Sequence, residues 1–418
     1  MKKLLLFFLL IFSLVLQSQN KIIEDIKVKG TKKTKIAFIK KIIKSKNGAV
    51  LDSIQLKEDI TFLKRLPTIA HAYYQVFHSH ENKYNVFIHI QENFTIIPDI
   101  AFWTALNNRF AYRLGVTEYN LFGRGISAGG YYQHNGYDTY AINFRAPNLF
   151  SRKFGLALNY QNWKSEEPLY FEEGTANYLY NNISTELLGI YQLNFNHQFT
   201  FGVSIFEENY TYLFGDISDN VPQFLHVDKV LYKLLYNYNN IDYYFQYLDG
   251  FKSELIVQYV TSVNDFQEKF FIAWNDFFCF KRVGDKGNWA NRFRFGLSTN
   301  NDSPFAPFAL DNNVNLRGVG ILVDRGTGVI VYNTEYRHTF YDKDWLTIQG
   351  NVFMDAGSWR NPGGKLSDFT NHNNIELFSG VGLRFINKKI YNATFRIDYG
   401  HSLKDKRGGI VFGIGQYF

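Results

Sequence analysis

From about residue 97 onward, apolar and polar residues alternate along the chain, and this period of two is typical of β-strands. For example, Val352 and Met354 fall on one face of such a segment, whereas Gln349 and Asp355 fall on the other. Segments that divide in the same way include 328–341 and 391–403. A soluble sandwich also alternates, but full charges on strand after strand cannot enter a dry core. A transmembrane barrel places polar side chains inside and apolar ones toward lipid. The alternation therefore predicts an all-β, antiparallel transmembrane barrel over residues 97–418.

Sixteen alternating segments can be counted, which agrees with the even strand number of single-chain bacterial barrels. They start near Ile97, Arg109, Gly125, Tyr137, Phe154, Ala176, Thr200, Lys229, Phe251, Phe266, Trp289, Gly328, Trp345, Glu376, Tyr391 and Gly409. The first and last strands should meet at a lateral seam. Gly413 and Gly415 weaken the last strand, and Pro98 in the first strand has no amide donor. We therefore expect few hydrogen bonds across the seam near Ala101.

The beginning of the chain has the pattern of an export signal. Lys2 and Lys3 precede an apolar run from Leu4 to Leu16, and small and polar residues follow it. The run is too short to span a bilayer, which requires about 20 residues. We expect a signal peptide at residues 1–18, with cleavage near Ser18.

Residues 20–96 show the mixed periodicities of a compact α+β domain. The expected elements are a strand at 22–28, helices at 36–43 and 53–66, and strands at 72–77 and 85–91. Their order is β-α-α-β-β. Residues 21–97 hold 14 Lys and Arg against 7 Asp and Glu, so the positive charge of the mature chain is concentrated here. An exported protein rarely meets nucleic acid, so we expect a solvated face or an anionic membrane surface instead.

The start of this domain resembles a known family. The segment Val28–Thr34 resembles the V-x-G-N-x-R-T opening of a POTRA domain, although Thr31 and Lys33 stand where Asn and Arg are usual. The spacing to both helices and to the closing strand Val86–Asn93 is also similar. The resemblance implies one POTRA-like domain at 20–96, located in the periplasm.

A second resemblance lies in the long connection between the eleventh and twelfth expected strands. There, Asn315–Gly320 resembles the V-R-G-F/Y motif in the sixth extracellular loop of the BamA/TamA/TpsB superfamily of outer-membrane assembly factors and transporters. In that family the loop folds into the lumen, and its Arg meets acidic groups on the inner wall. The resemblance implies a loop lock formed by Arg317 and Gly318 with Glu335 and Asp355, whose strands also resemble the family. Leu316 and Val319 depart from the motif, where Val and an aromatic residue are usual.

Two further features support the same family. Glu118–Gly125 resembles its N-L-F/L-G-x-G turn between early strands, with Asn120, Gly123 and Gly125 at the matching positions. Phe418 at the end of the last apolar strand resembles the C-terminal assembly signal of outer-membrane barrels. Read without the family, the first feature is a glycine-containing hairpin turn and the second an aromatic strand end.

Motifs of enzymes and cofactor sites are weak or missing. Gly125–Gly129 fits G-x-S-x-G, but that motif needs a strand, a sharp turn and a helix around Ser127, whereas an alternating strand continues here. The His residues show no paired-ligand spacing, and Cys279 is the single cysteine, so neither a metal site nor an internal disulfide is indicated. We expect no enzyme activity, no metal and no cofactor.

The resemblance leaves two functions open. The first is an accessory, BamA-like outer-membrane assembly factor that captures strands with its periplasmic domain and inserts them by lateral opening of the barrel. The alternative is a TpsB-like translocator that passes an exported substrate through the lumen. TpsB members usually carry two POTRA domains and a plug helix, which do not fit between Asn20 and Ile97, and this favours assembly. Expected partners are nascent outer-membrane or secreted proteins, outer-membrane lipids and periplasmic chaperones.

Overall fold

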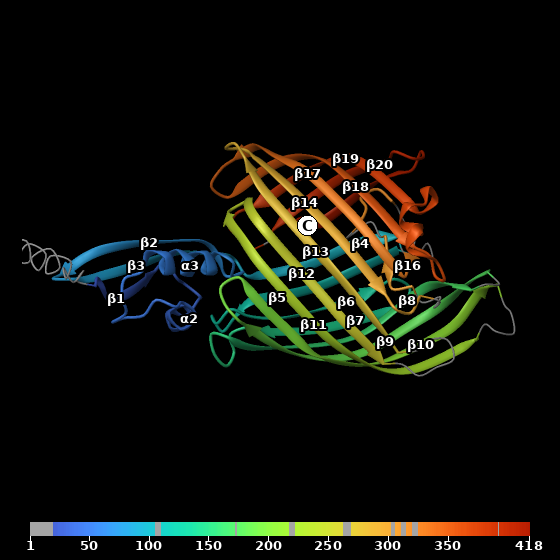
Figure 1. The fold of residues 1–418 in the computed structure, drawn as a ribbon, viewed down its shortest axis with the longest axis horizontal. Helices are drawn as coiled ribbons and strands as arrows, with labels where there is room; N and C mark the ends of the chain where they lie inside the picture. The colour runs from blue at the N-terminus through green and yellow to red at the C-terminus, as the bar shows by residue number, and fades with distance from the viewer. Residues whose placement is uncertain are drawn as a thin grey trace, which may run out of the picture.

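The computed structural model describes residues 20–104, 110–171, 174–216, 222–261, 269–301, 306–310, 315–319, 325–391 and 393–418. The expected signal peptide and Gly320 lie outside these ranges. Figure 1 shows a small domain at one end of a large barrel-like sheet. No helix within the described ranges is long and apolar enough to cross a membrane.

The small domain has the predicted order β-α-α-β-β. Its elements are β1 (Ile22–Lys29), α2 (Ile36–Ile42), α3 (Ser53–Lys64), β2 (Ile69–His80) and β3 (Lys83–Glu92). The helix α3 begins where the Asp52 carboxylate accepts hydrogen bonds from the amides of Ile54 and Gln55, a usual N-cap. Both helices pack their apolar residues on one face of a sheet with the order β1-β3-β2. The predicted α+β domain is therefore present.

The large sheet has sixteen strands, as predicted, and each pairs antiparallel with its neighbours. Its strands are β4 (Ile96–Thr104), β5 (Phe110–Leu121), β6 (Ile126–His134), β7 (Asp138–Ala146), β8 (Phe154–Phe171), β9 (Gly174–Gln192), β10 (His197–Gly215), β11 (Phe224–Tyr244), β12 (Tyr247–Thr261), β13 (Phe270–Val283), β14 (Gly287–Ser298), β17 (Gly328–Asp342), β18 (Leu346–Arg360), β19 (Ile375–Asn387), β20 (Thr394–Ser402) and β21 (Gly408–Ile414). A short hairpin, β15 (Phe308–Ala309) with β16 (Arg325–Gly326), lies in the connection from β14 to β17. Two 3-10 turns, Leu366–Thr370 and His372–Asn374, precede β19.

The two faces of the strands follow the predicted alternation. On β18, Val352 and Met354 are 56% and 40% exposed on the outer face, whereas Gln349 and Asp355 are buried on the inner face. The charged residues of the later strands therefore point into the lumen, as a transmembrane barrel requires.

Strands β8 to β11 have 18 to 21 residues and reach further than the last strands at the end away from the small domain (Figure 1). The strand β11 starts at Phe224, five residues before the expected Lys229. Its first residues place His226 and Asp228 on the outer face, where Glu207 of β10 also lies. A membrane crossing takes about 9–11 residues, so strands of this length extend beyond the apolar band. In these extensions both faces carry polar side chains, and the alternation by which a strand is recognised in the sequence is lost.

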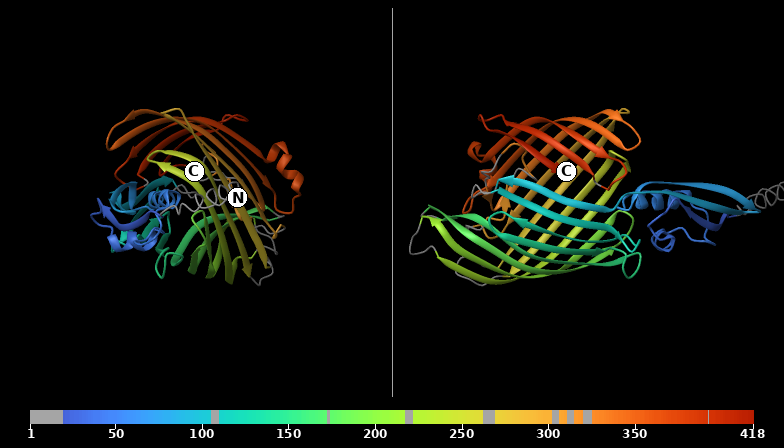
Figure 2. Two further views of the ribbon diagram at one scale, coloured as in Figure 1. Left: turned by 60° about the vertical axis from the view of Figure 1, so that its left-hand side comes forward. Right: turned by 180° about the vertical axis from the view of Figure 1, so that it is seen from behind.

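The barrel is not closed by a complete ladder. The sheet order runs from β21 to β4, and within the described ranges no backbone ladder joins these two strands. The last strand ends at Ile414 and does not continue to Phe418 as expected, because Gly415 adopts a φ of +89° and turns the chain away. Residues 415–418, called the tail below, lie within the outline of the barrel (Figures 1 and 2).

Candidate functional site

The connection between β14 and β17 folds back into the lumen at residues 315–319. Leu316 and Val319 are 0% and 4% exposed, and they pack with apolar residues of the barrel wall. This cluster contains Leu310, Leu316, Val319, Val329, Val331, Trp359 and Phe378. The two residues that depart from the family motif therefore anchor the loop by burial of apolar surface.

The structure brings the three charged residues of the predicted lock together. Nε and Nη2 of Arg317 donate to the two oxygens of Asp355 at 2.8 and 2.9 Å, and the Arg317 amide donates to the same carboxylate at 3.0 Å. Nη1 of Arg317 donates to Glu335. All three side chains are fully buried. The planar fork of a guanidinium matches this arrangement, and a lysine could not reproduce it.

The lock belongs to a larger ion network on β17 to β20. Glu335 also accepts from Arg337 and, at 3.4 Å, from Arg384, while Asp398 accepts from Arg384 at 2.8 Å. Arg396 lies 3.4 Å from Asp398. The alternation of β17 and β20 placed Arg337, Arg396 and Asp398 on the inner face, but their pairing with the lock was not predicted. Arg384 was missed, although Leu383 and Phe385 beside it show the same alternation.

The tail forms a second part of the site. The Arg317 guanidinium lies between two aromatic rings, 3.6 Å from the ring centre of Phe353 and 4.4 Å from that of Tyr417. Tyr417 is 6% exposed and its ring also lies 4.8 Å from the Arg396 guanidinium. Such contacts between a cation and an aromatic ring are attractive, and more so where water is excluded. The tail therefore binds the same arginine as the acidic residues of the lock.

Phe418 reaches the opposite wall. Its backbone oxygen accepts a hydrogen bond from Arg337 at 3.1 Å, and its ring packs on an apolar cluster of β11, β13 and β14. That cluster contains Ile241, Phe278, Phe280 and Ala290. The expectation that Phe418 completes the last strand is wrong, because contacts inside the lumen hold it there.

The loop also touches the strands of the seam. Gly318 has a φ of +95°, and a Cβ atom at this position would lie 2.6 Å from the Gly400 oxygen of β20. Only glycine satisfies both conditions. On β21, Gly409 lies beside Gly318 with ordinary spacing. The loop tip therefore lies directly against the backbones of the last two strands.

At the end that faces the small domain, a clasp holds the two sides of the seam together. The Phe94 amide donates to the Lys389 oxygen at 2.7 Å, and the Tyr391 amide donates to the Phe94 oxygen at 3.1 Å. The rings of Tyr119 and Tyr391 lie 4.8 Å apart. The linker before β4 therefore joins the turn between β19 and β20.

The predicted seam residues are not brought together. Ala101 pairs with Arg113 of β5, and Gly413 pairs with Arg396 of β20, and no described backbone pairing joins Ala101 to Gly413. Gly415 lies just beyond β21, where its amide donates to the Thr394 oxygen at 2.7 Å.

The predicted turn at Asn120, Gly123 and Gly125 has a contact that its sequence did not reveal. The Asn120 amide group donates to the Thr34 hydroxyl at 2.9 Å, and the Gly123 oxygen accepts from the Lys35 amide at 2.9 Å. A side chain at Gly123 would clash with the Lys33 carbonyl, and a Cβ at Gly125 would lie 2.7 Å from the Phe38 ring. The turn is therefore the surface on which the small domain docks.

Other contacts extend this docking around the barrel end. The Lys33 ammonium lies 2.5 Å from Glu118, and Lys64 lies 2.8 Å from Asp242. Arg65 donates to the backbone oxygens of Phe195 and Ile241, both at 3.2 Å. The small domain therefore contacts hairpin turns from β5 to β12 as well as the clasp.

On the domain side, Glu92 orders the loop that docks. Its carboxylate accepts from the amides of Lys33 and Thr34 at 2.9 and 2.7 Å. Burial alone raises the pKa of Glu92, but these hydrogen bonds outweigh it and hold the pKa below the ordinary value.

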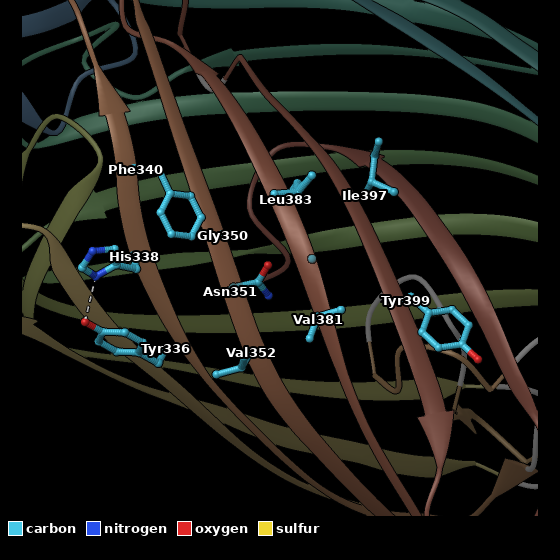
Figure 3. Close-up of a pocket in the computed structure, with 11 residues that line it drawn as sticks. Tyr336, His338, Phe340, Gly350, Asn351, Val352, Val381, Leu383, Ile397 and Tyr399 are labelled. Atoms are coloured by element: carbon cyan, nitrogen blue, oxygen red, sulfur yellow. Dashed lines mark hydrogen bonds between the residues drawn. The ribbon is translucent and has the colours of Figure 1, made fainter.

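Two hollows lie outside the lock. The inner wall of β7 to β11 has a cavity of about 360 Å³, lined mainly by polar residues that include Asn159, Glu186 and Lys233. An apolar groove of about 560 Å³ lies on the outer face of β17 to β20, where Phe340, Val352 and Leu383 line it (Figure 3).

Among the described residues, no group of three or more His, Cys, Asp or Glu could hold a metal. Ser127 lies within β6, and its hydroxyl donates to the Arg145 oxygen at 3.4 Å.

Comparisons with known proteins agree with this fold. No protein-family model matches the sequence, and no curated protein matches it at a significant level. BamA from Haemophilus ducreyi lacking POTRA domains 1–3 superposes with a TM-score of 0.54 at 13% identity, over 94% of this chain and 84% of that one. CdiB from Acinetobacter baumannii gives 0.61 at 14% identity, over 95% and 74%. CdiB from Escherichia coli gives 0.61 at 10% identity, over 94% and 73%.

These likenesses define the class of protein at the level of the fold. The chain has a mostly β fold with one sixteen-stranded antiparallel sheet, and this fold is similar to that of the BamA and CdiB barrels. BamA and CdiB are what it resembles in structure, and the fold is similar to both.

Proposed function

We propose that the protein is an outer-membrane assembly factor, which inserts other proteins into the outer membrane by lateral opening of its barrel. In this proposal residues 1–18 are a signal peptide and residues 20–96 are a POTRA-like domain in the periplasm. The protein acts without enzyme chemistry, cofactor or metal. Its partners are nascent outer-membrane or secreted proteins, together with outer-membrane lipids and periplasmic chaperones.

The observation that carries this proposal is the seam. Across the described residues, no ladder joins β4 to β21, and the tail is held in the lumen instead of lengthening β21. Apart from the two hydrogen bonds of the clasp, such a seam can part without breaking a ladder of backbone hydrogen bonds, whose groups would be costly to leave unpaired in lipid. The clasp at Phe94 joins the seam to the linker of the small domain. Movement of that domain is therefore transmitted to the seam.

The small domain supports strand capture. The edge of β1 is covered, because the amides of Ile23 and Leu51 donate to the oxygens of Ala49 and Lys21 at 2.9 and 2.7 Å. The strand β2 lies at the other edge of the sheet, and no described backbone group pairs with its outer side. An extended chain can add to such an edge by backbone hydrogen bonds.

The loop lock has a supporting role in this proposal. Arg317 links the acids of β17 and β18 to the tail, and Gly318 lies on Gly400 of β20. We infer that the lock holds the last strands and the tail in one arrangement until a client strand arrives at the seam.

A set of disulfides across the seam tests the proposal. Cysteine at Gly413 is combined in turn with cysteine at Ile97, Asp99 or Ala101, in a Cys279→Ser background that avoids mispairing. The control is a disulfide between Leu234 and Val257, which already pair on β11 and β12. We expect each cross-linked seam variant to lose assembly activity and to regain it on reduction, whereas the control stays active.

The alternative is a TpsB-like translocator, for which two observations speak. Both CdiB structures superpose with TM-scores of 0.61, and the inner wall of β7 to β11 leaves a cavity of about 360 Å³. A translocator passes its substrate through the lumen and needs only the loop and tail to move. Full activity of the cross-linked seam variants would therefore favour translocation over assembly.

A further inference from the structure

The sheet of the small domain packs one face on its helices and leaves the other face open. Across the open face the residues form rows, because Lys29 pairs with His89 and His89 pairs with Tyr73. In the next row Lys27 pairs with Phe87. In these two rows a cation on β1 lies beside an aromatic ring on β3, whereas the third row holds Asp25, Asn85 and Phe77. We call this surface the open face.

Aromatic rings dominate the open face. Tyr73 stacks on His89 with ring centres 4.7 Å apart, and Phe77 meets Phe87 edge-on at 5.4 Å. Tyr73 is 47% exposed and Phe77 is 51% exposed. Large apolar side chains gathered on an exposed surface mark a site of interaction.

The cations of this face have no acidic partner within the described part of the chain. The Lys27 and Lys29 ammonium groups lie 5.5 and 4.5 Å from the centre of the same Phe87 ring, and neither forms an ion pair there. Asp25 of the same strand is engaged by Asn47 at 2.9 Å and by Lys40. Two like charges that share one ring favour a carboxylate between them.

The open face continues into the contact with the barrel. The ring of His71, next along β2, stacks on Phe245 of the turn between β11 and β12, with centres 5.3 Å apart. Beside that turn a cavity of about 330 Å³ lies between the small domain and the barrel, with Arg65 and Arg337 in its lining. Figure 1 shows β2 running from the barrel end to the far tip of the domain. The rings and cations therefore form a track from the tip to the barrel.

We propose that the open face binds an extended segment of unfolded polypeptide that carries aromatic and acidic side chains on one side. In an extended chain, side chains on one side repeat about every 7 Å, which is also the spacing of successive rows on this sheet. Rings of the segment stack on Tyr73 and Phe87, and its carboxylates pair with Lys27 and Lys29. The domain projects beyond the barrel end, so most of the face lies away from the apolar band that contacts lipid (Figure 1). This inference rests on the proposed function, because it names the feature by which a client is recognised.

A binding experiment on the full-length protein in nanodiscs tests this inference. The probe is a fluorescent peptide of about ten residues with Phe and Asp alternating on one side, and fluorescence anisotropy gives its Kd. Lys27→Glu with Lys29→Glu should weaken binding about tenfold, since two attractions become repulsions. The matched control is Lys32→Glu with Lys57→Glu, which makes the same charge change on exposed lysines away from the open face.

A second variant and a second probe separate the alternatives. Tyr73→Ser with Phe77→Ser removes exposed rings without touching the domain core and should weaken binding of the same peptide by a similar factor. A peptide with Lys in place of Asp should bind the unchanged protein poorly. Equal peptide binding by the Lys27/Lys29 variant and the control would overturn the inference. So would loss of binding to anionic lipid vesicles with peptide binding unchanged, which would assign the face to membrane contact.

The test does not depend on the barrel seam. If the cross-linked seam variants keep full activity while the Lys27/Lys29 variant loses the peptide, the assembly mechanism fails and the binding face stands. If the seam variants are inactive and the peptide binds all variants equally, assembly stands and this binding face fails.

Discussion

The two sides of the barrel lumen differ in how they are filled. On β17 to β20, the filled side, the inner side chains of Arg337, Arg384 and Asp398 are 0% exposed and are covered by the loop and the tail. On β7 to β11, the open side, Glu186 pairs with Lys233 beside a cavity of about 360 Å³. The Glu186 side chain is 12% exposed and the Lys233 side chain is 20% exposed. Both sides carry buried polar residues, but only the filled side is covered by the loop and the tail. The filled side lies next to the seam.

This difference shows which side of the lumen depends on buried ion pairs. The partly exposed pair of Glu186 and Lys233 on the open side contributes less, because water beside the cavity competes with it. A buried network is different, since removal of one member leaves an uncompensated charge, whereas the intact network fixes one geometry. The filled side therefore holds the loop, the tail and the last strands in one arrangement.

The largest effect is expected from the lock itself. Arg317→Ala leaves Asp355 buried without its ion-pair partner and removes one of three arginines that pair with Glu335, which should destabilise the filled side by about 3–5 kcal/mol. Arg317→Lys should recover little, because an ammonium cannot form the fork. Limited proteolysis at Arg325 should become faster, while the barrel still resists heat-induced unfolding on gels.

The control for this experiment is Lys281→Ala. It removes an exposed ion pair between Lys281 of β13 and Asp249 of β12. It should change proteolysis very little. An Arg317→Ala protein with an intact loop and full activity would show that the filled side does not depend on the lock.

A smaller effect should follow a change at the loop tip. Gly318→Ala combines a positive φ with a close approach to Gly400, so we expect a loss of about 1–3 kcal/mol and a displaced loop. Gly284→Ala is the matched control, because Gly284 also has a positive φ but has open space around its Cβ position. The difference between the two thermal unfolding midpoints isolates the contact, and equal midpoints would argue against it.

The tail should have an effect of about 1–2 kcal/mol, as expected for a ring held between two guanidinium groups. Tyr417→Ala should release residues 415–418 and increase the ion conductance of the protein in planar bilayers. Phe412→Ala is the control, because Phe412 is an exposed aromatic residue on the outer face of β21. Unchanged conductance of the Tyr417 variant would mean that the tail does not obstruct the lumen.

The smallest effect concerns the docking of the small domain. Because the pKa of folded Glu92 is lowered, its contribution to stability is complete above the ordinary value of 4.5 and is lost as the pH falls through the lower folded pKa. Glu92→Gln should therefore lower the unfolding midpoint of the domain at pH 7, with a difference that shrinks under strongly acidic conditions. Glu81→Gln, in the exposed turn between β2 and β3, is the control. A difference that does not vary with pH would contradict the role of the Glu92 charge.

Much of this fold could be predicted from the sequence, because a membrane barrel imposes a strict period of two. The number of strands, their faces and the inward position of Glu335 and Asp355 all follow from that period. The proximity of Arg317 to these acids came instead from resemblance to a family, since the residues of a loop show no period.

The features that were missed depend on contacts between distant parts of the chain. Residues 409–418 alternate like a strand, and whether the chain turns at Gly415 is decided by Arg317 and Arg396 elsewhere in the sequence. The turn at Asn120 has an ordinary hairpin composition, and its partner Thr34 lies in another domain. A local pattern contains no signal for such contacts.

The central claim is that the seam beside the filled side lacks a ladder, and hydrogen exchange measures this most directly. The protein in nanodiscs is compared by mass spectrometry over residues 408–414 and 96–104, with 375–387 of β19 as the fully paired reference. Because β21 and β4 each have one unpaired edge, we predict that roughly half of their amides exchange early, while those of β19 stay protected. Protection of β21 and β4 equal to that of β19 would mean that the barrel is closed by a full ladder and would contradict the account.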